Sequence, residues 1–322
     1  MSSSSNSPEW VRSIVNSMQR RRGPLTDQRD WVVSEEWPSF SARFFLLSAG
    51  SDQVALKLGS NWPGDLAEYV ADETERVRDL LSHLPSGKVV MPGVLGVSTD
   101  PPALALDYLS GEPLFEAVPD LDEARRAAVL SLCGQAIGAY HSSEEVPHDP
   151  EADRAARDEL ASAARRSGLS GRALSKIEPG LTRSRGYRFS PNDFLLVDRE
   201  VLVLLDPPHV KKYDYVHRDL GSFFMELHRA LLGERAPRSG DDLARLQRAQ
   251  GDFLDGYRET GPDQLDTDQD RWAIDVFQIA RISGVAQNRL RTGKISAAGR
   301  ALSWAWWLRR GLRHRLTPVS GG

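Results

Sequence analysis

Residues 189–206 read FSPNDFLLVDREVLVLLD, and this stretch decides the fold. Two apolar runs, 194–197 and 201–205, flank the turn residues 198–200, which predicts a β-hairpin. Asp206 ends the second run. A carboxylate at the end of a fully apolar strand needs a metal ion or a charged partner to offset the cost of its desolvation. We therefore expect Asp206 to face a binding site.

Upstream of the hairpin, short apolar or β-branched runs predict a sheet. The candidate strands are residues 31–34, 42–47, 53–58, 93–97 and 103–109, and a turn at 49–52 suits a hairpin between the second and third. Residues 65–83 instead carry apolar side chains at helical spacing. The predicted order up to residue 109 is β-β-β-α-β-β.

Helical periodicity dominates the rest of the chain. The predicted helices span residues 121–141, 152–167, 218–232, 241–259, 270–291 and 296–316. At the N-terminus, the Ser-rich residues 1–7 are predicted to be disordered, and a short helix is expected at 8–21. We predict an α+β chain with a tail and short helix (1–24), a small antiparallel-sheet lobe (25–110) and a larger, mostly helical lobe (111–322).

Composition excludes several classes of protein. The 322 residues carry a net charge of −4, so no nucleic-acid partner is expected. Cys133 is the single cysteine, which rules out an internal disulfide, and its apolar surroundings predict a buried structural thiol. No stretch has the roughly 18 apolar residues that a membrane span needs. We expect a cytoplasmic protein.

Four segments together resemble one family. They are VALKL at 54–58, ALDYLSGEPL at 105–114, IGAYHS at 137–142 and the stretch at 189–206. This combination is similar to the aminoglycoside phosphotransferases and choline kinases, relatives of the protein kinases, and the resemblance covers residues 31–257. It implies a two-lobed protein-kinase-like fold, ATP and Mg²⁺ as cofactors, and phosphoryl transfer to a small-molecule hydroxyl.

The resemblance assigns nucleotide-binding roles in the first lobe. Lys57 matches the strand lysine that holds the α- and β-phosphates, although a solvated strand lysine is the competing interpretation. Glu73 falls where the family places the helical carboxylate that orients this lysine, with Glu75 as the alternative. The backbone of Asp107, Tyr108 and Leu109 corresponds to the hinge that binds the adenine edge. His141 resembles a family histidine that is more often structural than catalytic.

The catalytic loop departs from the family's pattern. The family's His-Gly-Asp corresponds to residues 186–188, so Arg188 stands at the position of the catalytic Asp. A guanidinium group stays protonated and cannot act as a base. The metal-binding Asn and Asp correspond to Asp193 and Asp206. Sliding the register by one residue puts Asn192 in the Asn role but offers only Tyr187 as base, so the sequence leaves activity open.

Two other segments are misleading. HRDL at 217–220 looks like a protein-kinase catalytic loop, but Phe224 stands where the required Asn would be and the stretch has helical character. We reject that assignment. Residues 34–41, which we expect between the first two strands at the phosphate loop, contain no glycine, so close approach of backbone N–H groups to phosphate is harder.

The C-terminal segment 301–316 combines three tryptophans with several arginines. On a helix, Trp304, Leu308, Leu312 and Leu316 share one stripe. A final helix packed on the second lobe is the preferred interpretation. The same pattern is typical of a helix that lies in a membrane interface, so peripheral contact with the inner face of a membrane is the alternative.

Three functions follow from these observations. The leading hypothesis is ATP- and Mg²⁺-dependent phosphoryl transfer to a hydroxyl of a small molecule, sugar or glycolipid. The second is a pseudokinase, a nucleotide-binding or nucleotide-free scaffold that regulates a partner. The third is a membrane-associated adaptor that uses the segment 301–316.

Overall fold

The computed structural model describes residues 9–21, 25, 30–38, 42–59, 62–147, 149–166, 182–186, 189–205, 213–233, 235–262, 265 and 268–316. The chain divides into two compact units. One consists of Met1–Gly111 with Val203–Val210, and the other of Glu112–Leu202 with Lys211–Gly322. We call them unit 1 and unit 2 and describe each separately.

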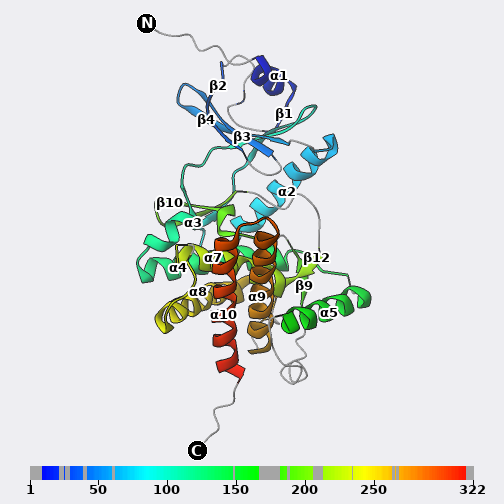
Figure 1. Ribbon diagram of the computed structural model, residues 1–322. Helices are drawn as coiled ribbons and strands as arrows, with labels where there is room; N and C mark the ends of the chain where they lie inside the picture. Colours follow the sequence, from blue (N-terminus) through cyan, green and yellow to red (C-terminus); the bar gives the residue numbers. More distant parts are fainter. Residues whose placement is uncertain are drawn as a thin grey trace, which may run out of the picture. The chain divides into compact units, whose positions relative to one another are not determined.

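Unit 1 is built on a six-stranded antiparallel sheet in the order β1-β6-β7-β4-β3-β2 (Figure 1). Its strands are β1 (Gln19–Arg20), β2 (Val32–Pro38), β3 (Ala42–Ala49), β4 (Asp52–Gly59), β6 (Val94–Thr99) and β7 (Pro102–Asp107). The short strand β5 (Val89–Val90) precedes β6. The five strands predicted for this lobe are confirmed. Strand β2 is longer than predicted and continues through Pro38, so most of the expected phosphate loop at 34–41 is strand, and residues 39–41 lie outside the described part.

One helix covers each face of this sheet. Helix α1 (Glu9–Ser17) packs Val11, Ile14 and Val15 on the face that presents Val54 and Leu56 of β4. Helix α2 (Gly64–Ser82) packs on the opposite face, which presents Ala55, and contacts β6 and β7. Because successive strand residues point to opposite faces, the Lys57 side chain lies on the α2 face with Ala55. The helix predicted at 65–83 is confirmed.

Unit 2 is mostly helical. Its helices are α3 (Leu114–Ala117), α4 (Glu123–Ser142), α5 (Pro150–Arg166), α7 (Val216–Leu231), α8 (Gly240–Thr260), α9 (Asp268–Arg291) and α10 (Ile295–Leu316), with 3₁₀ turns at Val118–Asp120 (η1) and Pro191–Asp193 (η2). Helix α4 packs closely along α8, and α9 packs on α7 and on α10 (Figure 1). The six helices predicted after residue 120 are confirmed within about two residues at each end that the structure describes.

Short strands complete unit 2. The predicted hairpin is confirmed as β10 (Phe194–Val197) and β11 (Val201–Leu204), although the last two residues of β11 belong to unit 1. Strand β8 (Glu112–Pro113) pairs with β10. Asp198 and Arg199 have φ values of 49° and 61°, the left-handed pair that a tight hairpin turn requires. A second antiparallel pair, β9 (Arg183–Arg185) with β12 (Tyr213–Tyr215), was not predicted.

Candidate functional site

Lys57 is the central residue of the candidate site in unit 1. It lies in β4 and pairs across the sheet with Phe44 of β3 and with Leu104 of β7. Only 2% of the residue is exposed. Its ammonium nitrogen lies 5.3 Å from the centre of the Phe44 ring and 5.1 Å from that of Trp62. The competing interpretation of Lys57 as a solvated lysine is therefore wrong.

Trp62 is held over β4 by a close approach to Gly59. A Cβ atom at position 59 would lie 2.2 Å from the Trp62 ring, so only glycine leaves room for the indole. This indole faces the Lys57 ammonium and partly shields it. Sequence reasoning missed Trp62, because a lone tryptophan after a strand carries no motif.

The two acidic candidates on α2 have different surroundings. Glu73 is buried on the helix face that also carries Val70 and Val77, and its carboxylate accepts hydrogen bonds from the Arg76 guanidinium at 2.9 and 3.1 Å. Glu75 is more exposed and accepts a hydrogen bond from the backbone N–H of Val94 at 2.7 Å. Glu73 thus shares the interface between α2 and the sheet with Lys57, whereas Glu75 anchors the start of β6.

The predicted hinge follows β7. The backbone N–H of Asp107 donates to the Gly93 carbonyl at 3.0 Å, and the Asp107 carboxylate accepts from the Gly93 N–H at 3.1 Å. The backbone N–H of Asp107 is therefore already engaged in a hydrogen bond. Tyr108 and Leu109 follow the end of the strand and are half-buried. Within the described part of the chain, their N–H groups form no hydrogen bond.

The segment that resembles a catalytic loop belongs to unit 2. Arg188 and Tyr187 lie outside the described residues, but both flanks of this pair are fixed. On one side, a Cβ atom at Gly186 would lie 2.6 Å from the Cβ of Asp214, so this position excludes the histidine that the family carries there. On the other, Phe189 is buried and contacts the Tyr140 ring edge-on at 5.2 Å.

A buried polar chain supports the backbone at Phe189. The Phe189 N–H donates to Oδ1 of Asp219 at 3.0 Å, and Oδ2 of Asp219 lies 3.3 Å from Nε2 of His141. Nδ1 of His141 lies 2.8 Å from the hydroxyl of Tyr257. Because the carboxylate only accepts, His141 carries its proton on Nε2 and accepts from Tyr257 at Nδ1. Three helices, α7, α4 and α8, thus hold one loop residue.

Electrostatics keep the Tyr257 phenol protonated. Burial raises the pKa of Tyr257 well above its usual value, and the negative charge of Asp219 raises it further. The phenol therefore remains a hydrogen-bond donor. His141 is structural, as expected. Asp219 lies within the first turn of α7, but its carboxylate bonds the distant backbone of Phe189.

Asp193 closes the 3₁₀ turn η2. Its carboxylate accepts from the backbone N–H of Ser190 at 2.6 Å, while the Ser190 hydroxyl accepts from the Asn192 N–H at 3.2 Å. The residue is half-buried. The second predicted ligand, Asp206, lies outside the described residues, two positions after β11 ends. Among the residues that the structure describes, no three His, Cys, Asp or Glu side chains form a cluster that could hold a metal ion.

Arg185, which immediately precedes the loop, is a buried cation that sequence reasoning missed. Its guanidinium donates to Glu144 at 2.9 Å and lies 5.4 Å from the Tyr140 ring centre. HRDL at 217–220, rejected above as a catalytic loop, lies in α7, and the buried His217 bonds Asp270 at 2.8 Å. Cys133 is buried, as expected, and burial raises the pKa of its thiol.

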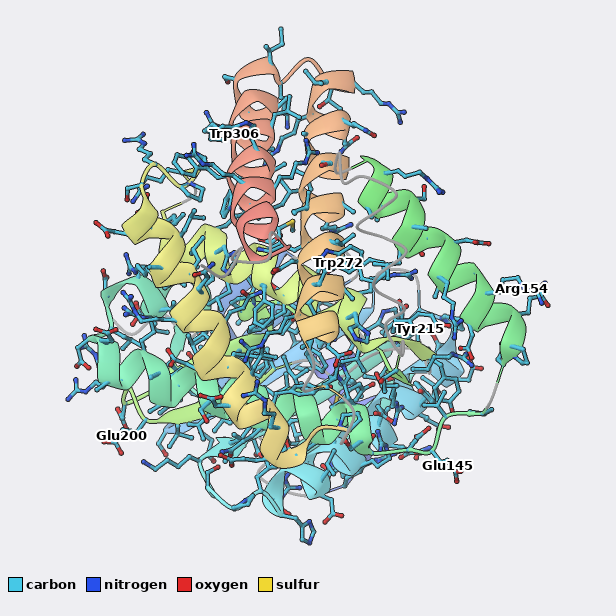
Figure 2. The ribbon with its side chains drawn as sticks, turned by 90° about the horizontal axis from the view of Figure 1, so that it is seen from below. Glu145, Arg154, Glu200, Tyr215, Trp272 and Trp306 are labelled. Carbon is cyan, nitrogen blue, oxygen red and sulfur yellow. The ribbon has the colours of Figure 1, made fainter. Side chains whose placement is uncertain are left out.

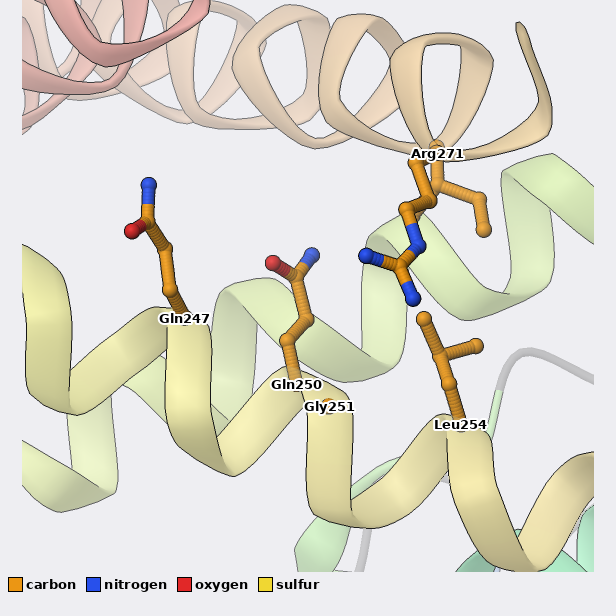
Figure 3. Close-up of a pocket in the computed structure, with 6 residues that line it drawn as sticks. Gln247, Gln250, Gly251, Leu254 and Arg271 are labelled. Carbon is orange, nitrogen blue, oxygen red and sulfur yellow. The ribbon is translucent and has the colours of Figure 1, made fainter. Parts of the chain in front are cut away.

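A pocket of about 230 Å³ lies between α8 and α9 (Figure 3). Its lining consists of Gln247, Gln250, Gly251, Leu254, Arg271 and Ile274. The Gln250 amide donates to Asp275 at 3.3 Å. None of the predicted site residues lines this pocket.

Comparisons with known proteins bear on the fold. No protein-family model and no curated protein matches the chain. Among solved structures, a glucosamine kinase in complex with glucosamine, ADP and inorganic phosphate is similar with a TM-score of 0.57 and 15% identity, over 89% of this chain and 83% of that one.

Two further solved structures cover similar shares of the chain. A Ralstonia eutropha JMP134 protein assigned to the aminoglycoside phosphotransferases has a TM-score of 0.53 and 16% identity, over 95% of this chain and 96% of that one. An amicoumacin kinase in complex with AMP-PNP and Ca²⁺ has a TM-score of 0.51 and 12% identity, over 88% and 89%. The chain therefore has the α+β, protein-kinase-like fold of these small-molecule kinases, as predicted.

Proposed function

We propose that the protein is an ATP- and Mg²⁺-dependent phosphotransferase-like protein that acts on a hydroxyl of a small molecule, sugar or glycolipid. The observation that carries the proposal is the buried ammonium of Lys57 on an inner strand of the sheet. Phosphoryl transfer depends mostly on positioning and charge neutralisation, and a strand holds a cation more rigidly than a loop. Unit 1 is then the nucleotide-binding lobe, and unit 2 carries the catalytic loop.

In this proposal each residue of unit 1 has a defined task. Lys57 would hold the α- and β-phosphates, and Glu73 would orient Lys57 from α2. Burial of Glu73 on the sheet side of α2 supports this choice over Glu75, which is committed to Val94. The adenine edge would bind the N–H groups of Tyr108 and Leu109, which form no hydrogen bond within the described part of the chain, with Asp107 fixing the start of the hinge through Gly93.

Asp193 and Asp206 would hold Mg²⁺. Carboxylate oxygens are the ligands that Mg²⁺ prefers, and the half-buried Asp193 is held in place by Ser190. The ion would neutralise phosphate charge. The chain's own contribution is to fix the loop through the hydrogen bond from Phe189 to Asp219. The proposed location is the cytoplasm, where ATP is available.

The alternative function, a pseudokinase, is favoured by the loop itself. Arg188 cannot accept a proton at the position of the catalytic Asp. The neighbouring Gly186 has no space for a histidine beside Asp214. In this alternative the chain would act as a nucleotide-binding or nucleotide-free regulatory scaffold, and Arg188 would bind an anionic group.

A thermal-shift measurement with Mg-ATP tests nucleotide binding. We expect the melting temperature of the parent to rise with Mg-ATP, because a ligand stabilises the state that binds it. Lys57→Met should abolish the rise, whereas Lys88→Met, at an exposed lysine of the same unit, should retain it. A parent that does not respond to Mg-ATP rules out the leading proposal and the nucleotide-binding form of the scaffold.

ATP turnover by Arg188→Asp beside the parent separates the two functions. A parent that already transfers phosphate to an acceptor supports the kinase. A large gain in the variant, from a parent without measurable turnover, identifies a degenerate kinase whose base has been lost. If Mg-ATP binds and neither protein turns it over, the pseudokinase is the better description.

A further inference from the structure

The chain carries a strong charge asymmetry at its C-terminal end. Residues 276–322 contain nine of the 41 Lys and Arg residues and none of the 45 Asp and Glu residues. This segment therefore has a net charge of +9, whereas residues 1–275 have a net charge of −13. Its described part forms most of α9 and the whole of α10.

Helix α10 packs on α9 through one face only. Ala298, Ala301, Trp304 and Ala305 are buried on that face. This agrees with the preferred interpretation of the tail, a final helix packed on the second lobe, because Trp304 belongs to the packed core. The side chains of Leu312 and Leu316 lie outside the described part.

The outer face of α10 exposes large apolar side chains. Ile295, Leu302 and Trp306 are 74%, 47% and 52% exposed and follow one another at spacings of seven and four residues, so they form one ridge. Figure 2 shows Trp306 on the side of α10 that faces away from α9. Leu290, near the end of α9, is also exposed beside the turn to α10.

Cations border this ridge. The Arg310 guanidinium lies 5.7 Å and 5.9 Å from the ring centres of Trp306 and Trp307, and Arg291, Lys294 and Arg300 are exposed. Apolar groups flanked by arginine and lysine, with no acidic residue in the segment, are complementary to an anionic lipid surface. Within the described part of the chain, no helix has the length and apolar character to cross a bilayer.

We propose that the ridge Ile295–Leu302–Trp306 with its flanking cations binds the anionic surface of a membrane and holds the protein there peripherally. A lipid surface needs no complementary shape, so a convex ridge of three or four side chains can insert into it. A stable protein interface requires roughly 1,000 Å² of well-packed surface. Residues 1–275 have a net negative charge and the ridge is bordered by cations. A second copy of the chain is therefore the competing occupant of the ridge. The proposal is independent of phosphoryl transfer.

Vesicle co-sedimentation of the full chain tests the proposal. We expect binding to phosphatidylcholine vesicles that contain phosphatidylglycerol, weakening as salt is raised, and no binding to phosphatidylcholine alone. The triple variant Ile295→Ser, Leu302→Ser, Trp306→Ser should lower the partition coefficient at least about tenfold. Arg310→Gln should lower it roughly fivefold at low salt, because each cation near an anionic surface contributes separately.

Matched controls separate the ridge from general effects. Val90→Ser, at an exposed apolar residue of unit 1, should bind vesicles as the parent does. Circular dichroism confirms that each variant is folded. The proposal is overturned if the parent fails to sediment with anionic vesicles at low salt, or if the triple variant binds them as well as the parent. A parent dimer that the triple variant dissociates, without vesicle binding, assigns the ridge to self-association instead.

Discussion

At Lys57, two aromatic rings and a sheet surround an ammonium group that is almost completely removed from water. Contact with the faces of Phe44 and Trp62 stabilises a desolvated cation by about 2 kcal/mol or more each. Desolvation of the ammonium costs several kcal/mol, and a carboxylate or a bound phosphate would offset more of this cost. Glu73 and a nucleotide are the proposed partners.

Substitution of Asp219 measures how strongly the segment that resembles a catalytic loop is held at Phe189. In Asp219→Ala, the Phe189 N–H and His141 Nε2 lose their acceptor inside the core. We expect the free energy of unfolding in urea to fall by about 2–4 kcal/mol, because a buried charge-assisted hydrogen bond is lost and two donors remain unsatisfied. Asp255→Ala, which breaks an exposed pair with Arg258, should change it by less than about 1 kcal/mol. Equal effects of the two substitutions would contradict this account of the loop.

His228 predicts a pH dependence of stability. Burial lowers its pKa to about 3, and Nδ1 lies 2.6 Å from the amide of Gln278. The unfolded chain binds a proton at His228 below pH 6.5 while the folded chain does not, so stability is lost as pH falls from about 6.5 towards 3. From pH 7 to pH 5 this residue should cost about 2 kcal/mol of unfolding free energy.

His228→Gln removes the titrating group and keeps an acceptor for Gln278. Urea unfolding at pH 7 and pH 5 should therefore show a smaller loss of stability for the variant than for the parent. Identical losses in both proteins would mean that His228 is accessible to protons in the folded state.

At the scale of elements, glycines set the distance between α4 and α8. A Cβ atom at Gly134 would lie 2.0 Å from the Phe253 carbonyl oxygen, and one at Gly256 would lie 2.0 Å from that of Ser131. Backbone atoms in the middle of two packed helices cannot move aside cheaply. This close packing brings His141 of α4 to Tyr257 of α8 and so supports the polar chain behind Phe189.

Alanine substitutions distinguish this contact from simple helix propensity. Gly134→Ala should destabilise the protein by at least about 2 kcal/mol, because the methyl group overlaps a backbone carbonyl. Gly251→Ala, in α8 with open space around the added methyl, should stabilise it by about 0.5–1 kcal/mol. Chemical denaturation of both variants measures the difference. A neutral Gly134→Ala would show that α4 and α8 are not locked together by this contact.

Long periodic segments were the predictable part of the fold. Each of α4, α7, α8 and α9 spans four turns or more, so its apolar spacing is evident. The strand pairs β9–β12 and β8–β10 include elements of two or three residues, too short to show any periodicity. The positions of Lys57 and Asp193 on their secondary-structure elements could be predicted from sequence motifs. The roles of Trp62 and Asp219 did not, because both depend on contacts between segments distant in sequence.

At the scale of the whole molecule, the chain combines a kinase-like fold with two departures. The loop carries Arg188 where the related motif has an acid, and the C-terminal helix exposes an apolar ridge within a segment of net charge +9. The ridge could have been found from the sequence, because Ile295, Leu302 and Trp306 share a helix face. The choice between it and the Trp304 stripe required knowing which face packs on α9.

A crystal structure of the full chain soaked with Mg²⁺ and a non-hydrolysable ATP analogue tests the central claim most directly. The account predicts that the Lys57 ammonium contacts an α- or β-phosphate oxygen and that Asp193 and Asp206 ligate Mg²⁺ beside the same nucleotide. A nucleotide bound away from Lys57, or Asp193 and Asp206 separated from any phosphate, would contradict it.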